Sequence, residues 1–152
     1  MEAGTRGPLN RISAFWDTSA LVPLLVRQSN TSRALAVYKT LDVVVWWATP
    51  VEIASAVARL LRTGKISTDD FAKSRNLANA LFSSWAVISP TDAIRATSMQ
   101  LVERYDLRAA DSLQLAAALL WCGDAPRGRI FLSSDQKLHD AALLSGFDAK
   151  RL

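Results

Sequence analysis

Four carboxylates stand where acids from distant parts of the chain can act together on one ligand. Asp17 directly follows the apolar segment ISAFW, and Asp135 directly follows IFLSS. Glu52 follows VVVWWATP after a short turn, and Asp111 begins a helical segment rich in Ala and Leu. Acids grouped at one site repel one another, and a hard divalent cation such as Mg²⁺ or Mn²⁺ removes that repulsion. Such ions activate water and stabilise the charge on a phosphate undergoing transfer.

Helix capping is the alternative explanation for the same acids. Asp17, Asp111 and Asp135 each stand where a predicted helix begins, and an N-cap typically contributes ~1 kcal/mol. Capping explains each acid singly, whereas the metal hypothesis depends on their convergence. Three further segments fit capping boxes, in which a Ser or Thr cap pairs with an acid three residues later. They are residues 49–52, with Thr49 as the cap and Glu52 as the acid, residues 67–70, and residues 89–92, with Asp92 as the acid.

The elements that position these acids alternate between strands and helices. Such alternation predicts a three-layer α/β/α sandwich around a five-stranded parallel sheet, in which Asp17 and Asp135 meet at the carboxyl edge of the strands. The segment RTGKIS joins two helices into a hairpin, with Gly64 after the first helix and Ser67 capping the second. The predicted strands cover residues 11–16, 42–47, 84–89, 129–133 and 146–152, and apolar residues at helical spacing predict helices within 20–25, 34–41, 53–61, 71–82, 94–105, 107–120 and 138–142.

The composition is typical of an ordinary compact domain. The chain has 152 residues, of which 50% are hydrophobic and 21% charged, and we expect a flexible leader over residues 1–10 followed by a single domain over residues 11–152. Cys122 is the only cysteine, which excludes an intramolecular disulfide and fits a reducing, cytoplasmic location. The net charge is +4, with 13 Arg against 5 Lys, which weakly favours a polyanionic partner.

Four segments in order resemble a PIN-domain ribonuclease, and in particular the VapC toxins of bacterial toxin–antitoxin pairs. The segment FWDTSALVPLL (residues 15–25) resembles the opening strand, Asp and helix of that family. TPVEIASAVARL (49–60) resembles its Glu-bearing helix, and YDLRAADSLQLAAAL (105–119) resembles its most recognisable segment. FLSSDQKLHDAA (131–142) resembles its last strand and acidic turn. The resemblance runs from about residue 12 to the end of the chain.

This resemblance implies a PIN-like fold and a metal-dependent endoribonuclease, the toxin of a toxin–antitoxin pair. Mg²⁺ or Mn²⁺ would be the cofactor, with RNA as the substrate and metal-activated water attacking the phosphodiester. A cognate antitoxin would cover the site, much of its groove being formed by the helical hairpin, and the chain would form a homodimer. Carried over by position, the family's site residues are Asp17 and Asp111 as metal ligands, Glu52 and Asp135 acting through metal-bound water, and Thr18, Ser19 and Ser134 as contacts to water or phosphate.

Other interpretations of the same residues remain open at this point. A PIN-like binding module with little or no nuclease activity is the alternative function. Cys122 and His139 suggest a thiol nucleophile with its base, although a structural cysteine explains Cys122 better. Asp92 is a further acid at a strand-to-helix junction, where capping is favoured. Of five Trp residues, Trp16, Trp46 and Trp47 are expected in the core, and the arginines that we consider for RNA phosphates are Arg59, Arg62, Arg75, Arg104 and Arg108.

Overall fold

The computed structural model describes residues 11–152, so the leader predicted for residues 1–10 lies outside the described part of the chain. All five strands and seven helices that the sequence predicts are present within this range. Their bounds are β1 (Ile12–Trp16), α1 (Thr18–Leu25), α2 (Thr31–Tyr38), β2 (Leu41–Trp46), α3 (Thr49–Arg62), α4 (Thr68–Phe82), β3 (Ala86–Ile88), α5 (Asp92–Arg104), α6 (Ala109–Trp121), β4 (Ile130–Ser133), α7 (Gln136–Ser145) and β5 (Asp148–Arg151).

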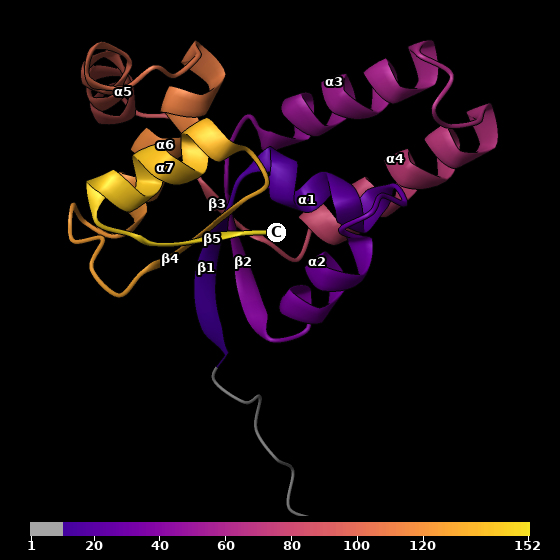
Figure 1. Cartoon of the computed structure of the whole chain (residues 1–152), viewed down its shortest axis with the longest axis horizontal. Coiled ribbons are helices and arrows are strands. Elements are labelled where there is room, and N and C mark those ends of the chain that lie inside the picture. The colour runs from indigo at the N-terminus through magenta and orange to yellow at the C-terminus, as the bar shows by residue number, and fades with distance from the viewer. Residues whose placement is uncertain (1–10) are drawn as a thin grey trace, which may run out of the picture.

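The five strands form one sheet in the order β3-β2-β1-β4-β5, and every neighbouring pair is parallel. The predicted parallel sheet is therefore confirmed. Strand β1 lies at its centre, and the chain leaves it in opposite directions, through β2 and β3 on one side and β4 and β5 on the other (Figure 1). A crevice forms outside the carboxyl ends of strands at such a switch point. Asp17 and Asp135 stand beside it, after β1 and β4.

Helices cover both faces of the sheet, and alternation along the strands explains why. Phe15 of β1 packs in a core with residues of α5, α6 and α7, whereas its neighbours Ala14 and Trp16 pack in a second core with residues of α1 to α4. Successive side chains of a strand point to opposite faces, so the consecutive apolar residues Ala14, Phe15 and Trp16 contribute to two cores. Figure 1 shows the two helical layers on either side of β1. The predicted three-layer sandwich is confirmed.

The hairpin of α3 and α4 follows its sequence signals. Gly64 adopts a left-handed φ of 70°, and the next N–H, that of Lys65, donates to the carbonyl of Leu60 at 2.9 Å. These features end α3 as a glycine C-cap does. Ser67 then caps α4 by accepting a hydrogen bond from the Asp70 N–H at 3.0 Å. The predicted Ser67 cap is thus confirmed, and the Asp70 carboxylate accepts from the Ser67 hydroxyl at 2.9 Å.

The capping box predicted for residues 49–52 is wrong. The N-cap of α3 is Ala48, which makes no side-chain capping bond, and Thr49 is the first helical residue. The Glu52 N–H donates to the Ala48 carbonyl at 3.2 Å, so it has no need of the Thr49 hydroxyl. The Thr49 side chain is instead buried, and its hydroxyl has no partner among the described residues. Glu52 is therefore available for another role.

Two further expectations need correction. In residues 89–92 the cap is Thr91, whose hydroxyl accepts from the Ile94 N–H at 3.2 Å, while Asp92 is an exposed first-turn acid paired with Arg95. Trp47 is 57% exposed rather than in the core, because it stands just beyond the last residue of β2 and outside the two layers. Within the described range, none of the helices has the length and hydrophobicity that crossing a bilayer requires.

Candidate active site

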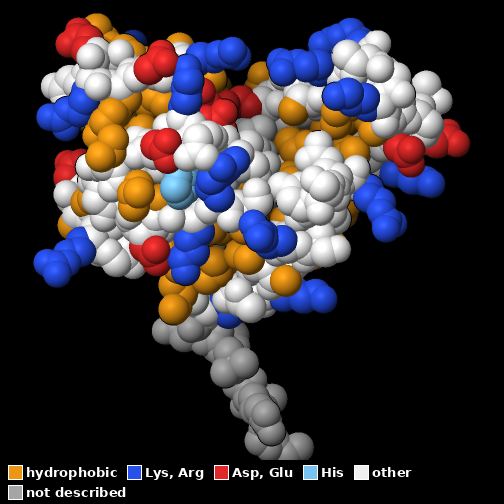
Figure 2. Space-filling view, viewed as in Figure 1, with side chains coloured by type: hydrophobic (Ala, Val, Ile, Leu, Met, Phe, Trp, Pro, Cys, Tyr) orange, Lys and Arg blue, Asp and Glu red, His pale blue; other side chains and the backbone are white. Residues whose placement is uncertain are grey.

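All four sequence-predicted acids line one pocket of about 310 Å³ at the carboxyl edge of the sheet. Asp17 comes from the end of β1 and Asp135 from the end of β4, whereas Glu52 is carried by α3 and Asp111 by α6. The pocket thus receives acids from the sheet and from both helical layers. Figure 2 shows acidic side chains gathered in a cleft between two lobes, with Lys and Arg on both sides. The pocket is lined by Asp17, Thr18, Ser19, Val22, Glu52, Ser55, Ala56, Arg59, Ala110, Asp111, Gln114 and Asp135.

Asp17 is the most deeply buried of the four, with 2% of its surface exposed. It caps α1 by accepting from the Ala20 N–H at 3.1 Å, and it also accepts from the Ser19 hydroxyl at 2.6 Å and the Ser133 hydroxyl at 2.7 Å. Burial raises its pKa to about 6, although these three hydrogen bonds work in the opposite direction. The Asp17 side chain therefore caps α1 and also lines the acidic pocket.

Glu52 is oriented by a buried amide from the opposite layer. Gln114, 1% exposed, donates from Nε2 to Glu52 Oε2 at 2.8 Å and to Thr18 Oγ1 at 3.0 Å. Its Oε1 atom has no partner among residues 11–152, so these two bonds define the amide's orientation. Burial raises the pKa of Glu52 to about 7, the Gln114 bond lowers it, and the negative charges of Asp17 and Asp111 raise it.

Asp111 stands in the first turn of α6 but is not its N-cap, as capping alone would have required. The N-cap is Arg108, and no side chain caps this helix. Burial and the charge of Asp135 raise the Asp111 pKa, while Arg108 lowers it. A helix N-terminus favours a negative charge by about 0.3–1 kcal/mol. The helix thus presents an ionisable acid to the pocket without using it for capping.

Asp135 and the two serines before it tie β4 to the start of α1. Asp135 caps α7, accepting from the Leu138 N–H at 2.9 Å, and is itself exposed. Its own N–H donates to the hydroxyls of Ser133 at 3.0 Å and Ser19 at 3.2 Å. The Ser134 N–H also donates to Ser19, at 2.8 Å. Ser19 is therefore the junction between the turns that carry Asp17 and Asp135.

The structure redistributes the polar contacts expected around the acids. Thr18 and Ser19 line the pocket as predicted, but the Ser134 hydroxyl accepts from Asn30 Nδ2 at 3.3 Å and is not among the lining residues. Ser133 holds Asp17 instead, because it ends β4 facing the buried side. Sequence reasoning also missed Gln114, three residues after Asp111 and so on the same helical face, which is a usable signal.

The donor set fits a hard divalent cation. The pocket offers four carboxylates as oxygen donors, and the negative charges of these carboxylates raise one another's pKa values. Within residues 11–152, no three His, Cys, Asp or Glu side chains form a ready-made ligand cluster. Mg²⁺ usually takes one or two carboxylates directly and keeps several waters. The chemistry of the residues present therefore fits the ion that the sequence suggested.

The other candidate groups lie away from this pocket. Cys122 is buried at the C-terminus of α6, donates to the Leu119 carbonyl at 3.3 Å, and has a pKa raised by burial. His139 on α7 contacts its neighbour Asp140 at 3.0 Å. Asp92, 94% exposed in its side chain, pairs with Arg95. None of these residues lines the acidic pocket, and the structural interpretation of Cys122 agrees with its environment.

A family model described as the PIN domain matches residues 14–144, a range that includes all four acids. The chain belongs to the PIN domain family. No curated protein matches the sequence closely. This PIN domain is similar in fold to a toxin–antitoxin complex from Klebsiella pneumoniae, with a TM-score of 0.60 at 18% identity over 82% of this chain and 88% of that one.

Two further solved structures show the same likeness. One is Mycobacterium tuberculosis VapC20, a toxin that cleaves the sarcin–ricin loop, with a TM-score of 0.64 at 16% identity over 85% of this chain and 95% of that one. The other is FitAcB from Neisseria gonorrhoeae, with a TM-score of 0.59 at 19% identity over 89% of this PIN domain and 96% of that chain. At these identities the likeness concerns the fold.

Proposed function

We propose that this PIN domain is a metal-dependent endoribonuclease and the toxin of a toxin–antitoxin pair. The observation that carries the proposal is the convergence of four carboxylates, from two strand ends and from both helical layers, on one pocket. VapC20, which shares the fold, is a toxin that cleaves the sarcin–ricin loop. The acids here are the residue types that hydrolysis of a phosphodiester with metal-activated water requires.

The proposed roles follow from burial and hydrogen bonding. A bound Mg²⁺ or Mn²⁺ would supply an acidified water and positive charge at the scissile phosphate. Asp17, which directly follows the central strand β1, and Asp111, in the first turn of α6, would hold the ion, as the family resemblance implies. Glu52 and Asp135 would act on ion-bound water. Gln114 keeps one Glu52 oxygen fixed, leaving the other to accept a water proton.

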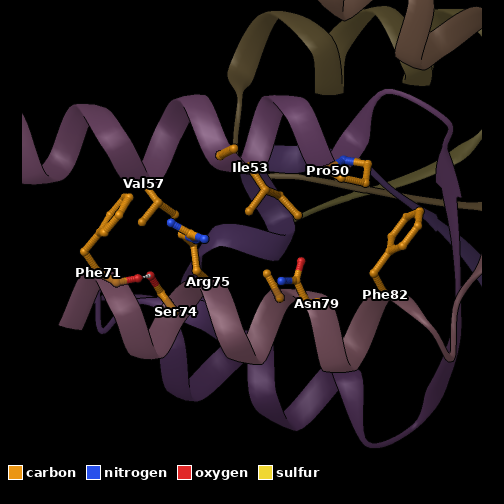
Figure 3. A pocket seen from close by; sticks show the side chains of 10 residues that line it. Pro50, Ile53, Val57, Phe71, Ser74, Arg75, Asn79 and Phe82 are labelled. Carbon is orange, nitrogen blue, oxygen red and sulfur yellow. Dashed lines mark hydrogen bonds between the residues drawn. The ribbon is translucent and has the colours of Figure 1, made fainter. Parts of the chain in front are cut away.

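An antitoxin segment would bind along the hairpin of α3 and α4. The facing sides of these helices line a largely apolar groove of about 170 Å³, in which Val57 and Phe71 lie at one end and Pro50 and Phe82 at the other (Figure 3). Ile53 lines the groove one residue after Glu52, so an occupant would lie beside the acidic pocket. Toxin–antitoxin complexes are among the structures that share the fold. Homodimerisation and a cytoplasmic location stay predictions.

RNA cleavage by purified protein tests the proposed function. We expect cleavage of total RNA with Mg²⁺ or Mn²⁺, loss of cleavage on adding EDTA, and loss of cleavage in Asp17→Asn and Asp111→Asn. Asp92→Asn is the matched control, since it removes a carboxylate outside the pocket. Cleavage that survives the chelator would exclude the mechanism. A folded wild-type protein that cleaves no RNA with either ion would favour the binding module.

A further inference from the structure

We propose that the RNA strand crosses the acidic pocket between two cationic subsites, which hold phosphates on opposite sides of the scissile one. Arg59 forms the first subsite, and Arg108 with Lys137 forms the second. This inference rests on the proposed function, because it places the substrate of that reaction. It goes beyond that function by assigning the path of the strand and the residues that bind its flanking phosphates.

The second subsite is a hollow that continues from the acidic pocket. It measures about 550 Å³ and shares Ala110, Asp111 and Asp135 with the pocket. The loop between α5 and α6 forms one wall and the start of α7 the other. A ligand bound at the acids therefore has room to extend into this hollow.

The walls of this hollow carry cations. Arg108 lies close enough to Asp111 to lower its pKa, and it is exposed. Lys137 on the facing wall reaches Asp106 at 2.6 Å, with both side chains largely exposed. Such a surface pair is worth about 0–1 kcal/mol, so the ammonium can turn to a phosphate at little expense. Behind Lys137, Arg151 donates to the Gln136 side chain and adds positive charge.

Arg59 stands on the other side of the acids. It lies on α3, seven residues and thus two helical turns after Glu52, and lines the acidic pocket. Figure 1 shows α3 on one side of the β1 end and α6 and α7 on the other. Arg59 is therefore carried by an element on one side of β1, and the hollow is formed beside elements on the other side. Of the five arginines considered for RNA, Arg59 and Arg108 line these two cavities, and Arg75 lies in the apolar groove.

Charge explains why cations are needed beside the acids, which line both the pocket and the hollow. RNA carries a phosphate at every nucleotide, and the four carboxylates alone would repel it. A divalent cation offsets that repulsion only at the scissile phosphate. The neighbouring phosphates need partners of their own, and guanidinium and ammonium groups are the side chains that bind phosphate. Arg59, Arg108 and Lys137 stand where those phosphates would pass.

Fluorescence anisotropy with a labelled single-stranded RNA of mixed sequence and Mg²⁺ tests the subsites. The measurements use the Asp17→Asn background, which the proposed function predicts to be inactive. Arg59→Ala and the double variant Arg108→Ala/Lys137→Ala should weaken binding about fivefold for each cation removed and reduce the salt slope by about 0.7 for each lost phosphate contact. Asp106→Asn frees Lys137 and should tighten binding.

The matched controls remove the same charge elsewhere. Arg62→Ala alters the same helix outside the pocket lining, and Arg127→Ala/Lys39→Ala alters exposed loops that precede β4 and β2, at the opposite edge of the sheet. Their affinities should equal that of the background protein. Equal weakening in the controls, or none in the subsite variants, would overturn the proposal. Cleavage by the Asp17→Asn background would instead contradict the proposed function.

Shortening the RNA separates the two subsites. When the oligonucleotide is shortened from one end, one subsite variant should lose its effect on affinity, and shortening from the other end should remove the effect of the other variant. This pattern also gives the polarity of the strand. If both variants lose their effect on shortening from the same end, the strand does not run between the subsites and the proposal fails.

Discussion

Asp17→Asn is predicted to stabilise the metal-free protein at neutral pH while abolishing RNA cleavage. The pKa of Asp17 is raised from 3.8 to about 6, chiefly by burial. A tenfold change in proton affinity corresponds to about 1.4 kcal/mol, so ionised Asp17 lowers the free energy of unfolding by an amount on the order of 3 kcal/mol. Asn keeps the N-cap, since it caps helices about as well as Asp, and it carries no charge to desolvate.

The sign of the pH dependence follows from linkage. Below about pH 3.8 the Asp17 carboxyl is protonated in both the folded and unfolded states, so burying it costs no stability through its charge. As the pH rises from there through about 6, the unfolded chain ionises first, and stability falls. Above that range the burial of ionised Asp17 lowers the free energy of unfolding by the full amount. The difference in stability between Asp17→Asn and wild type should therefore be largest at pH 8 and shrink on acidification.

Chemical and thermal unfolding in EDTA at pH 8 and at about pH 4 measure this difference. A gain of that size corresponds to a rise in Tm of roughly 6–12 °C in a protein of this length. Asp92→Asn controls for a general charge effect. Mn²⁺ should then stabilise wild type by preferential binding to the folded state, and leave Asp17→Asn unchanged. If Asp17→Asn is less stable than wild type at pH 8, capping outweighs desolvation and the reasoning is wrong.

Three further predictions concern the pocket and its frame. Because Asp17 and Glu52 have pKa values of about 6 and 7, protons compete with the cation, and Mn²⁺ affinity measured by calorimetry should rise as pH increases through that range. Gln114→Leu removes a bond that lowers the Glu52 pKa, so the acidic limb of the pH–rate profile should move to higher pH; an unmoved limb would contradict the positioning role. Gly64→Ala should reduce the free energy of unfolding by about 1 kcal/mol in urea titrations and leave cleavage intact, because φ is 70° there and nothing within 4 Å would clash.

The sequence was most informative where backbone direction alone places a side chain. Asp17 and Asp135 directly follow parallel strands, and parallel strands end at the same edge, so their proximity was predictable. Asp111 was not predictable in the same way. Its position depends on which end of α6 reaches the edge of the sheet, and that is set by packing of the helix rather than by its own residues.

The predictions about Thr49 and Ser134 failed because each depended on the exact position of one residue. The Thr49 capping box matched in residue types, but a main-chain bond to Ala48 had already satisfied the N–H that the cap would serve. Ser133 and Ser134 are indistinguishable by type, and only the phase of β4 decides which side chain meets Asp17. Such choices depend on a single residue of register, which composition and periodicity do not fix.

The division of the acids among the layers has a consequence for synthesis of the protein. The pocket needs Asp17 near the beginning of the chain, Asp135 near its end, and two helices that pack on opposite faces of the sheet. A nascent chain still emerging from the ribosome therefore holds at most part of the site, even after β1, α3 and α6 have left the exit tunnel. Activity that depends on all four acids would thus begin only after the segment that carries Asp135 has also emerged and packed.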